Sequence, residues 1–194
     1  MKKAWVVGVL GAAAAVLILV ISDQLASPEA GKCDAVPGAL AKFQPADDPA
    51  PVPDEPFILG SDELRTLQSY AGQGLVVNFW ATWCAPCIKE MPELLRLKSR
   101  LADAGIQVLA ISQDRKGADI VGKFLEINKL DGLGVLIDKR GRLGRKLGIK
   151  GLPTTFLIDP QGREVGRVLG VEKWDDAAVV AALRDCLAPA GAGG

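Results

Sequence analysis

Hydrophobic and polar residues alternate along most of this chain in patterns that predict strands and helices in turn. Short apolar runs bounded by glycine or polar residues are typical of buried strands, and apolar residues spaced by three and four are typical of helices. The predicted helices are Ser61–Tyr70, Ala85–Ala104, Gly117–Lys129, Leu143–Leu147 and Trp174–Leu187. The predicted strands are Leu75–Trp80, Ile106–Ser112, Val135–Asp138, Thr154–Asp159 and Glu164–Leu169. This order predicts an α/β fold in which helices cover both faces of a central mixed β-sheet.

The first 21 residues stand apart because they contain one long apolar run. The segment from Ala4 to Ile21 has no charged residue, and as a helix it would span about 27 Å, close to the thickness of a bilayer core. Lys2 and Lys3 precede it, and the positive-inside rule places them in the cytoplasm. We therefore expect residues 1–21 to anchor the chain in the inner (cytoplasmic) membrane, with the remainder in the periplasm or another extracytoplasmic space. The alternatives are a cleaved signal peptide and a buried core helix.

Proline is concentrated just after this segment. Seven of the 12 prolines lie between Pro28 and Pro56, among alanines and acidic residues. Such a composition favours an extended spacer, so residues 22–56 are predicted to be a linker and arm. An arm that packs on the domain around Cys33 is the alternative. Residues 57–188 would then form the folded domain, and residues 189–194 a disordered tail.

Composition narrows the classes of function. Lys plus Arg and Asp plus Glu are equal at 23 each, which argues against a nucleic-acid binder with a large basic surface. The sequence has no histidine, which excludes histidine-based catalytic triads and histidine-ligated metal or haem sites. We expect no metal and no cofactor, so the four cysteines carry the candidate chemistry.

Cys84 and Cys87 form a Cys-Ala-Pro-Cys motif between a predicted strand and a predicted helix. The positive end of the helix dipole would stabilise a thiolate on Cys84, and the thiolate is the attacking species in disulfide exchange. Cys87 lies close enough to resolve a mixed disulfide, and Pro86 suits the first helical turn. A zinc site would need two further ligands, and a purely structural disulfide fits poorly with the Trp-rich surface loop that precedes the pair.

These motifs resemble the thioredoxin superfamily, and in particular its membrane-anchored TlpA/ResA-type thiol–disulfide oxidoreductases. The resemblance covers roughly residues 57–188 and implies a thioredoxin-like fold. It is carried by the string NFWATWCAPC that includes Trp83, Cys84 and Cys87, by Glu90, Met91 and Pro92, and by Gly151-Leu152-Pro153-Thr154.

The resemblance also implies roles for single residues. Cys84 would be the exposed nucleophile and Cys87 the buried resolving thiol. Pro153 matches the family's cis-proline that faces the disulfide, although an ordinary trans turn is the alternative for this residue. The groove for a client peptide is expected to include Trp83, Pro86 and Leu152.

Glu90 is a candidate proton acceptor for the resolving thiol. It lies three residues after Cys87 and therefore near the same face of the predicted helix. Partial burial would raise the pKa of its carboxyl group. Asn78 occupies the position of the buried aspartate of general thioredoxins and cannot shuttle a proton, which leaves this task to Glu90 or water. An exposed, inert acid is the alternative.

Cys33 and Cys186 are the second cysteine pair. An even cysteine count outside the cytoplasm favours a disulfide, and TlpA-like proteins carry such an additional structural bridge. It would fasten the arm to the last helix. A second redox pair and an intermolecular Cys33 bond are the alternatives.

Together these features predict an extracytoplasmic reductase of client disulfides. No basic residue stands between Cys84 and Cys87, which favours a reducing couple. The resemblance implies a transmembrane electron donor of the CcdA/DsbD type. For the protein itself, the resemblance implies a role in cytochrome biogenesis, with apocytochromes c or copper-delivery proteins of cytochrome oxidase as clients. An oxidant or isomerase of the same fold, a thiol peroxidase and a copper-delivery protein are the alternatives.

Overall fold

The computed structural model describes residues 33–60 and 62–190 of the chain. The predicted anchor, Ala4–Ile21, and the last four residues of the predicted tail lie outside these ranges. Within them, no helix is long and apolar enough to cross a membrane.

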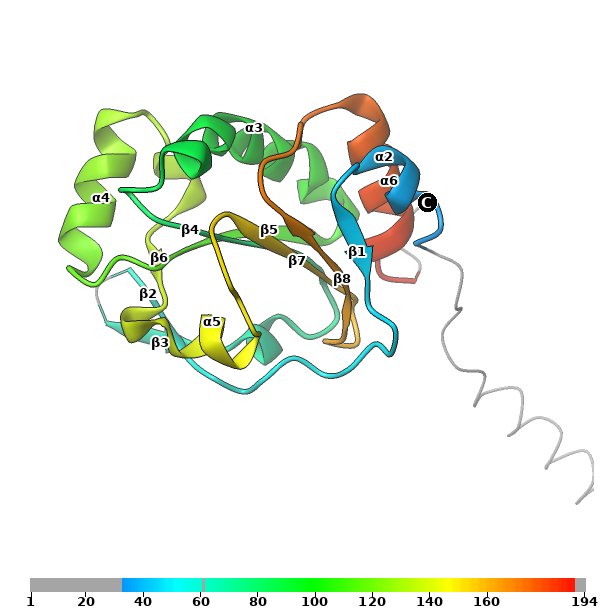
Figure 1. Cartoon of the computed structure of the whole chain (residues 1–194), viewed down its shortest axis with the longest axis horizontal. Helices are drawn as coiled ribbons and strands as arrows, with labels where there is room; N and C mark the ends of the chain where they lie inside the picture. The colour runs from blue at the N-terminus through cyan, green and yellow to red at the C-terminus, as the bar shows by residue number, and fades with distance from the viewer. Residues whose placement is uncertain (1–32, 61, 191–194) are drawn as a thin grey trace, which may run out of the picture. The chain divides into compact units, whose positions relative to one another are not determined.

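Eight strands form one mixed sheet in the order β1-β8-β7-β4-β5-β6-β2-β3 (Figure 1). Strand β4 pairs in parallel with β5, and β5 with β6, while the other neighbours are antiparallel. All seven residues of β4 are buried, so the strand that leads into the Cys-Ala-Pro-Cys motif lies at the centre of the core. The strands are β1 (Phe43–Pro45), β2 (Phe57–Leu59), β3 (Glu63–Arg65), β4 (Gly74–Trp80), β5 (Ile106–Ser112), β6 (Leu136–Ile137), β7 (Thr154–Ile158) and β8 (Glu164–Leu169).

Helices cover both faces of this sheet (Figure 1). Alternate residues of β4 point to opposite faces. Val76 and Trp80 join the core under the longer helices, whereas Val77 and Phe79 join the core on the side of α5. The helices are α2 (Val36–Ala39), α3 (Ala85–Leu101), α4 (Ala118–Ile127), α5 (Arg142–Lys146) and α6 (Ala177–Leu187), with 3₁₀ turns at Leu67–Tyr70, Ala102–Ala104, Asp131–Leu133 and Lys139–Gly141.

The predicted mixed α/β sheet is confirmed, and most predicted elements agree with the structure to within a few residues. Helix α3 shows why. Met91, Leu94, Leu97 and Leu101 are fully buried and recur at helical spacing. Gly105 then takes a positive φ of 66°, as a helix-terminating glycine does.

One predicted element in the first third of the chain is wrong. The predicted helix Ser61–Tyr70 is instead strand β3 followed by a 3₁₀ turn, because β3 pairs with β2 in a hairpin that leaves Leu64 two-thirds exposed. The predicted linker and arm, residues 22–56, is described only from Cys33 onward. Part of the predicted linker belongs to the domain, since α2 packs beside α6 and β1 forms the sheet edge against β8.

Candidate active site

The Cys-Ala-Pro-Cys motif lies where β4 ends and α3 begins. Cys84 is the N-cap of α3, and its Sγ accepts a hydrogen bond from the backbone N–H of Cys87 at 3.3 Å. Pro86 lies in the first turn, where its missing N–H costs no helical hydrogen bond. A thiolate on Cys84 would therefore face the positive end of a 17-residue helix.

Cys84 and Cys87 are joined by a disulfide with a Cα–Cα distance of 5.3 Å. The residue exposure is 6% for Cys84 and 0% for Cys87. Of the two sulfur-bearing residues, only Cys84 retains contact with solvent, so it is the one that an external thiol or disulfide can reach.

The peptide bond between Leu152 and Pro153 is cis. This loop lies beside the disulfide because Thr154, the first residue of β7, pairs with Phe79, near the end of β4. The loop is held at both ends: Gly170 N–H donates to the Pro153 carbonyl, and the Thr154 hydroxyl donates to the Gly151 carbonyl at 2.8 Å.

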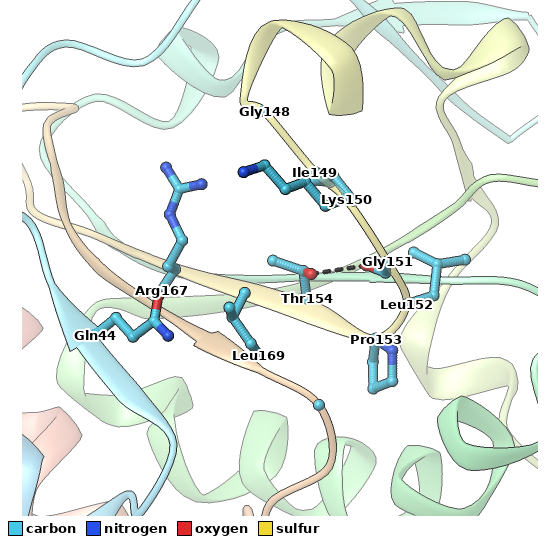
Figure 2. A pocket seen from close by; sticks show the side chains of 11 residues that line it. Gln44, Gly148, Ile149, Lys150, Gly151, Leu152, Pro153, Thr154, Arg167 and Leu169 are labelled. Atoms are coloured by element: carbon cyan, nitrogen blue, oxygen red, sulfur yellow. Dashed lines mark hydrogen bonds between the residues drawn. The ribbon is translucent and has the colours of Figure 1, made fainter.

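A cavity of about 430 Å³ lies against this loop (Figure 2). Its walls come from β1, β7, β8 and the segment 148–153. Leu152 is half-buried, whereas Trp83, beside Cys84, is 71% exposed. The indole of Trp83 is thus an exposed apolar surface next to Cys84.

Glu90 is buried on the side of α3 that faces the sheet. Asn78 of β4 donates to its Oε1 and the indole N–H of Trp174 donates to its Oε2, both at 2.9 Å. Burial raises the pKa of the Glu90 carboxyl to about 7, although the hydrogen bonds from Trp174 and Asn78 oppose this rise. Glu90 can therefore gain or lose a proton near neutral pH, one helical turn from Cys87.

Asp114 fixes the loop that leads to Cys84, a role that the sequence did not reveal. Its Oδ2 accepts from the Thr82 backbone N–H at 2.9 Å and from the Ser112 hydroxyl at 2.8 Å. Its Oδ1 accepts from the Thr82 hydroxyl at 2.7 Å. The place of Asp114 in the sequence could have indicated this role. An acid just after the buried strand β5 lies beside the end of the parallel strand β4, where the loop to Cys84 begins.

The second cysteine pair lies on other elements. Cys33 and Cys186 form a disulfide with a Cα–Cα distance of 4.4 Å. The bridge joins the segment before α2 to the last turn of α6, and these two helices lie side by side (Figure 1). The structure thus brings Cys84, Cys87, Glu90 and the Leu152–Pro153 loop together, and places the other pair apart from them.

Within residues 33–60 and 62–190, no group of three or more Cys, Asp or Glu side chains is arranged to hold a metal ion.

The chain is similar to a known protein family and to known thiol-disulfide oxidoreductases. A family model described as AhpC/TSA matches residues 49–163. The thiol-disulfide oxidoreductase ResA of Bacillus thuringiensis subsp. konkukian (strain 97-27) is 37% identical over 105 residues, which cover 54% of this chain and 59% of that protein. ResA of Geobacillus thermodenitrificans (strain NG80-2) is 34% identical over 122 residues, which cover 62% of this chain and 69% of that protein. The first of these matches thus spans about three-fifths of its relative's length.

A crystal structure of a secreted thiol-disulfide isomerase from Corynebacterium glutamicum is also similar. It superposes with a TM-score of 0.60 and 26% sequence identity, and the match covers 82% of this chain and 95% of that one.

Proposed function

Since the chain belongs to the AhpC/TSA family, we propose that it is a thiol–disulfide oxidoreductase that reduces client disulfides through Cys84 and Cys87. One observation carries this proposal: a Cys84–Cys87 disulfide at the start of the 17-residue helix α3, with only Cys84 of the pair reaching solvent. The similarity to ResA proteins supports the same activity.

In the proposed reaction, the Cys84 thiolate attacks one sulfur of the client disulfide. A bond forms between Cys84 and the client, and the client's other sulfur leaves as a thiolate that takes a proton from water. Cys87 then loses its proton to the Glu90 carboxylate and attacks the Cys84 sulfur. The client's second thiolate leaves and is protonated. Two electrons have passed from the protein dithiol to the client, and Cys84 and Cys87 end as a disulfide.

We also propose a cellular location, an electron donor and clients for this reaction. The apolar run Ala4–Ile21 would anchor the chain in the inner membrane with its domain outside the cytoplasm. A transmembrane dithiol donor of the CcdA/DsbD type would restore the reduced pair. Apocytochromes c and copper-delivery proteins of cytochrome oxidase are the proposed clients.

A redox titration of the full-length chain in a non-ionic detergent tests the proposal. We expect Cys84–Cys87 to equilibrate with dithiothreitol buffers at about −200 to −270 mV, and the reduced chain to reduce insulin disulfides. The variant Cys84→Ala should be inactive.

The similarity to the secreted isomerase supports an oxidant or isomerase as the second candidate. A potential near −120 mV, roughly that of a strong oxidant, would favour it over the reductase. Rapid consumption of hydrogen peroxide by the reduced chain would instead indicate a thiol peroxidase.

A further inference from the structure

A groove of about 300 Å³ borders the proposed active site on the side of α5. Its lining includes Trp83 and Leu152, which flank the Cys84–Cys87 disulfide and the cis-proline loop. The other lining residues include four basic side chains and, among the described residues, no acidic one. We call this surface the cationic groove; its basic residues are Arg115, Arg140, Arg145 and Lys150.

The charges of the cationic groove are not neutralised within the described part of the chain. All four basic residues are exposed, and none forms an ion pair. Arg145 donates to the backbone carbonyl of Arg140, which orients its guanidinium. Its charge helps to lower the pKa of Glu55, but it forms no ion pair with this carboxylate. The nearby acids Asp114 and Asp138 are buried, and their oxygens accept hydrogen bonds from the protein itself.

The basic residues on the other side of α5, by contrast, are neutralised by an acidic residue. Arg142 and Lys146 both pair with the buried carboxylate of Glu55 at 2.8 Å. The hydrogen bond from Lys146 and the charge of Arg142 lower the pKa of Glu55, against the effect of burial. Of the three basic residues of this short helix, Arg142 and Lys146 thus fasten the segment that contains Glu55, and Arg145 lines the cationic groove.

Arg140, one of the four basic residues of the cationic groove, has an unusual backbone conformation. Arg140 has a φ of 73°, in the left-handed region that side chains with a Cβ rarely adopt. Non-glycine residues in this region cluster at functional sites, where the surrounding structure holds them. Here the conformation lies at the rim of the cationic groove.

The cationic groove and the cavity beside the cis-proline loop are both lined by the segment 149–152. Figure 2 shows the side chains of Lys150 and Arg167 extending over that cavity. Arg167 is engaged by Glu164, whereas Lys150 has no partner among the described side chains. A client that reaches Cys84 along this loop therefore meets free positive charge on one side.

From this arrangement we propose that the cationic groove selects clients whose reactive disulfide lies next to acidic residues. This inference rests on the proposed function. Carboxylates of the client would pair with the four basic side chains while Trp83 and Leu152 contact the residues around its cysteines. Charge of this kind chiefly accelerates association and rejects partners of like charge.

Three cyclic peptides provide the test. Each contains one Cys-Gly-Gly-Cys disulfide with two identical residues on either side of it. These flanking residues are glutamate in the first peptide, glutamine in the second and lysine in the third. The rate constant for reduction by the reduced full-length chain is measured by stopped-flow tryptophan fluorescence in non-ionic detergent. At low salt we expect the glutamate peptide to react at least about tenfold faster than the glutamine peptide, and the lysine peptide more slowly than both. This advantage should largely vanish in about 0.5 M salt, where screening is strong.

The variant Arg115→Gln/Lys150→Gln should reduce the tenfold advantage to about threefold, because it removes two of the four positive charges of the cationic groove. The variant should fold normally, because neither side chain forms an ion pair within the described part of the chain. The control Lys123→Gln, at an exposed position of α4 outside the groove, should keep the full advantage. Equal rates for the three peptides would overturn the inference while leaving the proposed function intact, and no reduction of any peptide would overturn both. Equal rates together with variant-sensitive binding to phosphatidylglycerol vesicles would assign the groove to a membrane surface and also overturn it.

Discussion

The indole N–H of Trp174 donates a hydrogen bond to the carboxylate of Glu90 across 84 positions of sequence. This contact joins the segment before α6 to the active-site helix. Asn78 of the central strand donates to the other oxygen of the same carboxylate. Glu90 is therefore held from two sides in a buried position, where burial raises the pKa of its carboxyl group.

The first prediction concerns the pH dependence of the reaction. The pKa of Glu90 is about 7, so its carboxylate can accept the Cys87 proton above this pH and not below it. We expect the rate constant for client reduction to rise with pH through about 7. The variant Glu90→Gln should lose this step and be at least about tenfold slower at pH 8.

The matched control is Glu126→Gln, which removes an exposed carboxylate from α4. It should keep the step in the pH profile. An unchanged profile in Glu90→Gln would show that another group, or water, takes the proton of Cys87.

The same carboxyl group makes stability depend on pH. Its pKa in the folded chain, about 7, lies above the usual value of 4.5, so the folded state binds more protons than the unfolded state between these values. The free energy of unfolding should therefore fall as pH rises from about 4.5 to about 7, by up to about 3 kcal/mol from this group. Urea unfolding of the oxidised chain should show this fall, and Glu90→Gln should remove most of it.

Trp174→Phe tests the hydrogen bond itself. The variant keeps an aromatic ring but removes a donor that favours the charged form of Glu90, so the pKa of Glu90 should rise further. We expect the step in the pH–rate profile to move to higher pH. The loss of unfolding free energy should be about 1–3 kcal/mol at pH 8 and smaller at pH 5.5, where Glu90 is protonated. A loss that is equal at both pH values would attribute the effect to packing alone.

Asp114 should stabilise the loop before Cys84 through hydrogen bonds rather than through charge. Asp114→Ala leaves the buried hydroxyl of Ser112 and the part-buried N–H and hydroxyl of Thr82 without their acceptor. We expect it to lower the free energy of unfolding by about 2–4 kcal/mol and to slow client reduction. Asp114→Asn is the matched control, because its oxygen can keep two bonds while its amide donates to the Thr82 hydroxyl. Equal losses in the two variants, measured by urea unfolding, would contradict this explanation.

The sequence predicted the centre of the site because that information is local. A buried strand, a Cys-Ala-Pro-Cys motif and an amphipathic helix follow one another, and their order places Cys84 at a helix start. Glu90 follows from helical spacing. The Leu152–Pro153 loop was predicted from the family resemblance, since the dipeptide alone does not distinguish a cis from a trans bond.

The short outer strands and the partner of Glu90 could not be predicted from the sequence, because they depend on tertiary contacts. The strands β1, β2 and β3 have three residues each, too few to show a period, and they form because a neighbouring strand is available. Leu64 and Leu67 have helical spacing, yet pairing with β2 holds Leu64 in a strand. The partner of Glu90 could not be predicted because Trp174 reaches it only after α6 packs against α3.

The last prediction separates the two cysteine pairs. Closing the chain between Cys33 and Cys186, 153 positions apart, stabilises the folded state by about 5 kcal/mol if the cross-link acts mainly on unfolded-chain entropy. We expect Cys33→Ala/Cys186→Ala to lose stability of this order and to keep the redox potential of Cys84–Cys87. Urea unfolding gives the first quantity, and alkylation with mass spectrometry gives the second.

The control is Cys84→Ala/Cys87→Ala, which opens a loop of only three positions and should cost far less stability. In dithiothreitol buffers that half-reduce Cys84–Cys87, the Cys33–Cys186 bridge should remain oxidised, because it fastens the segment before α2 to α6, outside the proposed client groove. A bridge that titrates together with Cys84–Cys87 would instead be a second redox pair. In that case electrons would pass between the pairs, and Cys33→Ala/Cys186→Ala would change the rate of client reduction rather than stability alone.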